Sequence, residues 1–166
     1  MRTPASVARH PIHPMLVPIP IGLWVFSLIC DLIYRFGSGD TVWFTVATYD
    51  MIAGIIGALA AAVFGFVDLL SLPAGPKRTA LVHMSINLLI VVLYVVNAWL
   101  RITPGEYTDT PVILSIIAIS LLLVSGWLGG QLVYVHKVAV NTDETATGAA
   151  ARPQDRAATG KRHAKA

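Results

Sequence analysis

Four long apolar stretches constrain the fold of this chain more than any other feature of its sequence. They cover about residues 15–34, 47–72, 79–102 and 111–135. Each is near or above the roughly 20 residues that an α-helix needs to cross the hydrocarbon core of a bilayer. Backbone groups in lipid must bond internally, and the strict alternation typical of barrel strands is absent. The sequence therefore predicts four transmembrane helices.

The composition of the 166-residue chain agrees with this interpretation. Hydrophobic residues make up 55% and charged residues 13%, with a mean hydropathy of +0.69, whereas soluble domains carry about 25% charged residues. A disordered chain is excluded, and a water-soluble fold is disfavoured. The single cysteine, Cys30, excludes an intrachain disulfide and a CxxC motif. We expect an all-α integral membrane four-helix bundle over residues 1–140.

Both ends of the chain differ from the bundle. Pro18 and Pro20 are expected to deform the start of the first span, so that regular helix begins only near Pro20 and His13 precedes it. Residues 141–166 lack an apolar period, which predicts a disordered basic tail. Its charges favour solubility or weak attraction to anionic lipid, and no aromatic interleaving points to nucleic acid.

The distribution of Lys and Arg predicts the orientation. With four helices, the two termini and the 73–78 loop share one side of the membrane. That side carries five basic residues near the spans, and the other side carries two. The five are Arg2, Arg9, Lys77, Arg78 and Lys137, and the two are Arg35 and Arg101. The positive-inside rule then predicts a bacterial inner-membrane protein with both termini in the cytoplasm.

Polar residues inside the spans carry most of the functional information, because each is costly in lipid. Near the outer surface, the four-residue spacing of Asp31 and Arg35 allows an ion pair on one helix, and Asp50 and Arg101 are expected to pair between helices. Charges at span ends that pair or snorkel are the favoured interpretation of this layer.

The cytoplasmic layer is the candidate site, because every predicted helix delivers a His or Asp there. His13, Asp68, His83 and His136 converge on one membrane level. Imidazoles and a carboxylate are plausible ligands for a transition-metal ion, and two imidazoles are plausible axial ligands for haem b. His83 and His136 are the first choice of axial pair, and His13 is the alternate. Asp68 and Asn87 would orient the imidazoles.

Other functions remain open on the same residues. Taken singly, His136 suits a helix C-terminus as a cation, and Asp68 suits an ion pair with Lys77 or Arg78. Asp50 and Asp68 project from one helical face, which is compatible with a proton or ion pathway in a homo-oligomer. A ligand-free structural or assembly protein is the third alternative. No HExxH, P-loop, GxSxG or dinucleotide motif is present, so no catalytic residue is assigned.

Three segments resemble a known family. They are the opening run from His10 to Trp24, the segment Gly65–Asp68 followed by His83 and Asn87, and the ending from Gly126 to His136. Over about residues 10–140 the chain resembles the bacterial predicted membrane proteins catalogued as domain of unknown function 2231. Lys137 stands where that family usually has glycine after the histidine. The resemblance implies a four-helix inner-membrane domain that can occur with Rieske iron–sulfur domains, and hence an iron–sulfur or other redox protein as partner.

Overall fold

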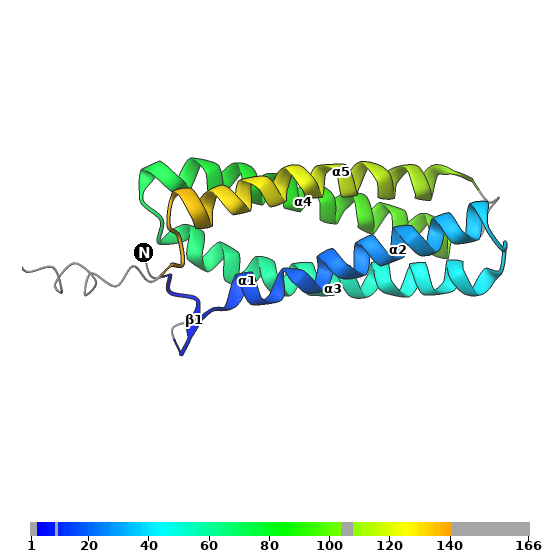
Figure 1. The fold of residues 1–166 in the computed structure, drawn as a ribbon, viewed down its shortest axis with the longest axis horizontal. Coiled ribbons are helices and arrows are strands. Elements are labelled where there is room, and N and C mark those ends of the chain that lie inside the picture. The colour runs from blue at the N-terminus through cyan, green and yellow to red at the C-terminus, as the bar shows by residue number, and fades with distance from the viewer. Residues whose placement is uncertain (1–2, 9, 104–107, 141–166) are drawn as a thin grey trace, which may run out of the picture.

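The computed structural model describes residues 3–8, 10–103 and 108–140 and consists almost entirely of helices (Figure 1). A short helix α1 (Ile12–Leu16) leads into α2 (Pro18–Phe36), and α3 (Thr41–Leu70), α4 (Ala74–Ile102) and α5 (Thr110–Gly130) follow. A π-helical turn, η1 (Gln131–Val135), continues α5. A small antiparallel hairpin of β1 (Ser6–Val7) and β2 (His10–Pro11) precedes α1. The predicted tail, residues 141–166, lies outside the described residues.

Four helical segments are long and apolar enough to cross a membrane, which confirms the predicted fold class. They are Ile12–Phe36, Thr41–Leu70, Ala74–Ile102 and Thr110–Val135. Local sequence explains several of their starts. The Asp40 side chain accepts a hydrogen bond from Val42 N (3.0 Å) and caps α3, and Pro111 occupies the first turn of α5, where its missing N–H costs nothing.

Helix begins earlier at the N-terminal end than the two prolines suggested. Val17, between α1 and α2, keeps right-handed helical dihedrals, and its N–H bonds to His13 O at 3.2 Å. Ile21 N likewise reaches Val17 O at 3.4 Å. The fixed φ of proline suits a helix, so Pro18 and Pro20 remove donors without ending it. The expectation that His13 precedes the first helix was therefore wrong: His13 lies on α1.

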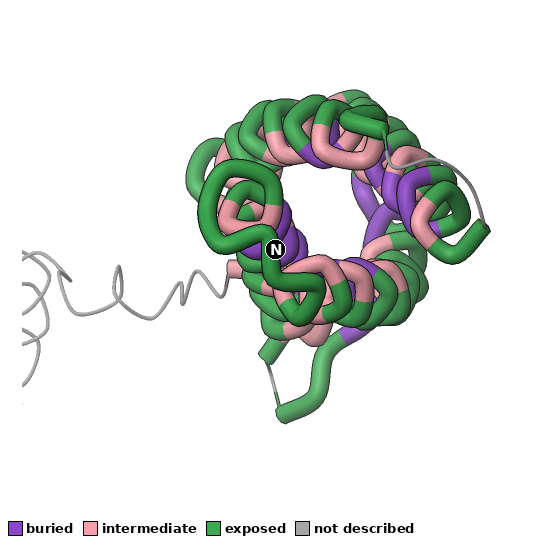
Figure 2. Tube along the Cα trace, turned by 90° about the vertical axis from the view of Figure 1, so that its right-hand side faces the viewer, coloured by how far each residue is buried: buried purple, intermediate pink, exposed green. Residues whose placement is uncertain are grey.

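The helices run up and down around a closed ring. Successive helices from α2 to α5 pack on one another, α5 returns to contact α2, and α1 packs on α3. Figure 2, seen along the bundle axis, shows the four helices as a ring with most of the buried residues on its inner surface. Both described ends of the chain lie at one end of the bundle, at the left of Figure 1. We call this the terminal end, and the other the opposite end.

The middle of the bundle is an apolar layer centred on two aromatic rings. Trp24 on α2 stacks on Tyr94 on α4 with 4.3 Å between the ring centroids. Met51, Ile90 and other buried apolar residues surround the pair. Trp24 Nε1 donates to Met51 O at 3.3 Å, which satisfies its buried N–H. The pair ties α2 to α4 across the bundle.

The outer surface is apolar, as expected for a protein that contacts lipid. Large hydrophobic side chains are exposed along all four long helices, among them Phe26, Ile56, Leu88 and Leu123. In water such a surface would be a large unpaired apolar patch. In a bilayer it is the surface that lipid covers.

Candidate functional site

His13 is held inside the terminal half of the bundle by a backbone carbonyl of α3. Its Nδ1 lies 2.8 Å from Ala61 O. A carbonyl oxygen only accepts, so Nδ1 is the donor in this hydrogen bond. The ring packs directly over Gly65, where a Cβ atom would lie 2.9 Å from His13 Nδ1. Glycine at this position is what allows the imidazole to approach α3.

His83 on α4 is held in the same way by α5. Its Nδ1 lies 2.9 Å from Ser125 O and 3.0 Å from Ser125 Oγ. Asn87, one turn along α4, donates to His83 O at 2.9 Å and lies 3.1 Å from His83 Nε2. Gly129 faces the ring, and a Cβ atom there would lie 3.3 Å from it. Donation from Nδ1 to Ser125 leaves Nε2 as an acceptor.

The two imidazoles meet across the bundle interior. Their ring centroids are 6.5 Å apart and their planes are nearly perpendicular, at 87°. His13 comes from the first span and His83 from the third, so helix packing alone brings them together. The sequence named His13 only as the alternate partner of His83, and the structure makes it the neighbour of His83.

Asp68 lies toward the terminal end of α3, where it binds the N-terminal segment. Its Oδ1 accepts a hydrogen bond from Ala5 N at 2.9 Å, and the residue is only 8% exposed. Among the described residues it forms no ion pair with Lys77 or Arg78, the two partners considered from sequence. Asp68 therefore docks residues that precede β1 against the bundle.

His136 does not lie at the depth of the imidazole pair but beyond it, at the end of the last span. It caps η1, and it is half-buried. Gly129, which faces His83, precedes His136 by seven residues, a rise on the order of 10 Å along a helix. Ser125 and Gly129 both lie at His83 and not at His136. Within the described residues, no group of three or more His, Cys, Asp or Glu side chains is arranged to hold a metal ion.

A second polar cluster fills the opposite end of the bundle. Arg101 on α4 donates to both carboxylate oxygens of Asp31 on α2, at 2.8 and 2.5 Å, and to Asn97 Oδ1 at 2.9 Å. The arginine and aspartate side chains are 1% and 3% exposed. The expected Asp31–Arg35 and Asp50–Arg101 pairs were wrong, and Arg101 does not snorkel. The helices are rotated so that Asp31 and Arg101 both face the interior.

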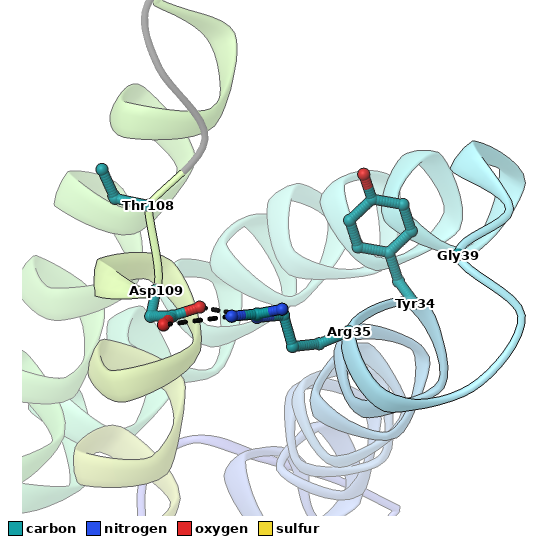
Figure 3. Close-up of a pocket in the computed structure, with 5 residues that line it drawn as sticks. All are labelled: Tyr34, Arg35, Gly39, Thr108 and Asp109. Atoms are coloured by element: carbon teal, nitrogen blue, oxygen red, sulfur yellow. Dashed lines mark hydrogen bonds and ion pairs between the residues drawn. The ribbon is translucent and has the colours of Figure 1, made fainter.

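Arg35 pairs instead with Asp109, and both residues line a pocket of about 510 Å³ (Figure 3). Tyr34, Gly39 and Thr108 complete its lining. Arg35 Nε lies 2.7 Å from Asp109 Oδ1, and both side chains are at least half exposed. The hydrogen bond and the charge of Arg35 hold the pKa of the Asp109 carboxyl below its usual value.

A family model described as "Predicted membrane protein (DUF2231)" matches residues 9–142. The chain belongs to the DUF2231 family. This confirms the resemblance. The matched range includes His13, His83 and the four helical segments that are long enough to cross a membrane. No curated protein and no solved structure matches the chain. The family description states a membrane protein and no activity.

Proposed function

We propose that this DUF2231 protein is a redox-associated membrane subunit that binds haem b between His13 and His83. The geometry of the imidazole pair carries the proposal. His13 and His83 would hold the haem iron, and their ring centroids lie 6.5 Å apart across the bundle interior. A haem held by two histidines would supply electron transfer.

The number of protein ligands favours haem over a bare metal ion. A porphyrin provides four nitrogens, so two imidazoles complete the coordination of its iron. A structural or catalytic zinc site needs at least three protein ligands. His13 and His83 have no third His, Cys, Asp or Glu grouped with them among the described residues. A transition-metal ion is the second candidate. It would need a further ligand from Asp68 or His136, and that residue would have to move toward the imidazole pair.

The surroundings of each ring support a ligand role. Both Nδ1 atoms donate to backbone carbonyls, of Ala61 and Ser125, and such bonds fix the tautomer and raise the basicity of Nε2. Gly65 and Gly129 place no side chain against the rings. Iron binding at His83 Nε2 requires Asn87 to release that atom. Asn87 can retain its bond to His83 O and so continue to position the helix turn.

The test is a visible absorption spectrum, with metal analysis, on protein purified in mild detergent. The proposal predicts a Soret band that shifts on reduction, with about one iron per chain. His13→Ala and His83→Ala should each lose the band. His136→Ala is the matched control and should retain it. Stoichiometric metal without a Soret band would favour the metal-ion candidate. If freshly purified protein shows neither a Soret band nor stoichiometric metal, the ligand-free structural or assembly role remains.

The proposed location is a bacterial inner membrane with both termini in the cytoplasm. The excess of Lys and Arg on the terminal side supports this orientation. Electrons would then pass between the haem and a soluble or membrane redox partner, such as an iron–sulfur protein, on the cytoplasmic side. Reporter fusions test the orientation. Alkaline phosphatase fused after Val140 should be inactive, and fused in the 37–40 loop it should be active. The reverse pattern would invert the topology.

A proton or ion pathway is the alternative function, and it would need a homo-oligomer. Asp50 and Asp68 both lie on α3 and are the acids that favour it. The test is flux into liposomes that contain the purified protein. Flux that is lost in Asp68→Asn would support the pathway, and flux no higher than in empty vesicles would remove it.

A further inference from the structure

One carboxylate oxygen in the opposite half of the bundle has no hydrogen-bond partner among the described residues. Asp50 is the tenth residue of α3 and is half-buried, and its Oδ2 atom is the buried oxygen that no described residue hydrogen-bonds. The only arginines at this end among the described residues, Arg35 and Arg101, are committed to Asp109 and Asp31. An ionised carboxylate in such a place would carry the full cost of an unpaired charge.

The surrounding groups form a small polar cluster. From α2, Cys30 is fully buried and lies within electrostatic range of both Asp50 and Asp31. From α4, Tyr94 is fully buried, lies within range of Asp31 and Arg101, and its hydroxyl also has no hydrogen-bond partner among the described residues. Cys30 thus lies near Asp50, and Tyr94, whose hydroxyl is also unpartnered among the described residues, lies near the Asp31–Arg101 ion pair. Natural interiors rarely leave such atoms unpaired.

We propose that Asp50 is a proton-binding site, in which the half-buried carboxyl holds an exchangeable proton in the membrane. Protonation removes the charge that nothing on α2, α3 or α4 balances, and it turns one oxygen into a donor. Release returns the proton to water and leaves the carboxylate.

Infrared difference spectroscopy on the protein in lipid nanodiscs tests this directly. At neutral pH the spectrum should contain the C=O stretching band of a protonated carboxylic acid, sensitive to H₂O/D₂O exchange. Asp50→Asn, which has the same shape as the protonated acid, should remove that band and fold normally. Asp109→Asn is the control and should retain it, because that carboxylate is ion-paired with Arg35 and exposed at the bundle end.

A second variant, combined with isotope labelling, checks that the carboxylic acid band belongs to Asp50. Labelling all aspartate carboxyls with ¹³C should shift the band in the wild-type protein, whereas in Asp50→Glu the new acid band should not respond to the label. Loss of the band in Asp68→Asn and not in Asp50→Asn would overturn the proposal, as would the absence of any carboxylic acid band. Neither outcome depends on haem, so this test and that of the proposed function fail separately.

Discussion

Replacing Asp31 by Asn is the sharpest test of how the opposite end of the bundle is held together. Arg101 makes three hydrogen bonds, two to the Asp31 carboxylate and one to Asn97, and the ion pair is almost completely buried. Asn97 in turn donates to Pro111 O at 2.7 Å and Ser115 Oγ at 2.9 Å. The substitution therefore strands a buried guanidinium within a network that joins α2, α4 and α5.

The magnitude follows from that burial. Removing one partner of a buried pair costs about 3–5 kcal/mol, because the remaining charge is left uncompensated. This corresponds to roughly a 10²- to 10⁴-fold smaller folding equilibrium constant. Replacing both residues, as Asp31→Leu with Arg101→Met, should recover most of the loss, since no charge is then left unpaired.

Reversible unfolding in mixed micelles, followed by circular dichroism or tryptophan fluorescence, measures the effect. Asp109→Asn is the matched control, because it breaks the exposed Arg35 pair at the same end of the bundle. Exposed pairs contribute little in solvent, so this variant should unfold like the wild type. If Asp31→Asn were as mild as Asp109→Asn, the buried network would not be what stabilises this end.

Two further perturbations follow from local geometry. Gly54→Ala should destabilise by about 1–3 kcal/mol in the same unfolding assay, because a Cβ atom there would lie 2.4 Å from Trp24 Nε1 and must displace the ring. Gly22→Ala, with nothing within 4 Å, is the control, and equal effects would contradict the packing argument. The pKa of Asp109, measured by carboxyl ¹³C NMR, should be lower than that of an ordinary aspartate, because the neighbouring Arg35 lowers it. Since the folded pKa is depressed, the pair stabilises the fold above the unfolded pKa and loses this contribution as pH falls through the folded one; Arg35→Gln should raise the value, and no change would refute the assignment.

Hydropathy was sufficient to predict the four helices, because lipid forces every long apolar stretch into one regular structure. It was less informative about partners inside the bundle. The choice of Asp31 or Asp50 for Arg101 depends on how far each helix is rotated and shifted along its neighbour. Each helix carries apolar residues on most of its faces, so the sequence pattern hardly constrains its rotation. The packing of the four helices on one another determines that Arg101 pairs with Asp31.

The same reasoning applies to the candidate site. The sequence identified His13, His83 and Asn87, and the structure brings these three together. His136 was ranked above His13 because His83 and His136 were expected on consecutive helices at one membrane level. The early start of helix at Ile12 carries His13 inward, and η1 extends the last span before His136. The contact of Ser125 with His83 could not be predicted from hydropathy, because hydropathy does not fix which face of α5 packs on α4.

The stacked rings of Trp24 and Tyr94 have a further consequence for a bundle with polar groups at two depths. Along both α2 and α4 they lie between the imidazole pair and the Asp31–Arg101 ion pair, within a cluster of buried apolar side chains. Such a layer offers few polar partners to a water molecule. The two sets of buried polar groups are therefore separated within the bundle by an apolar layer.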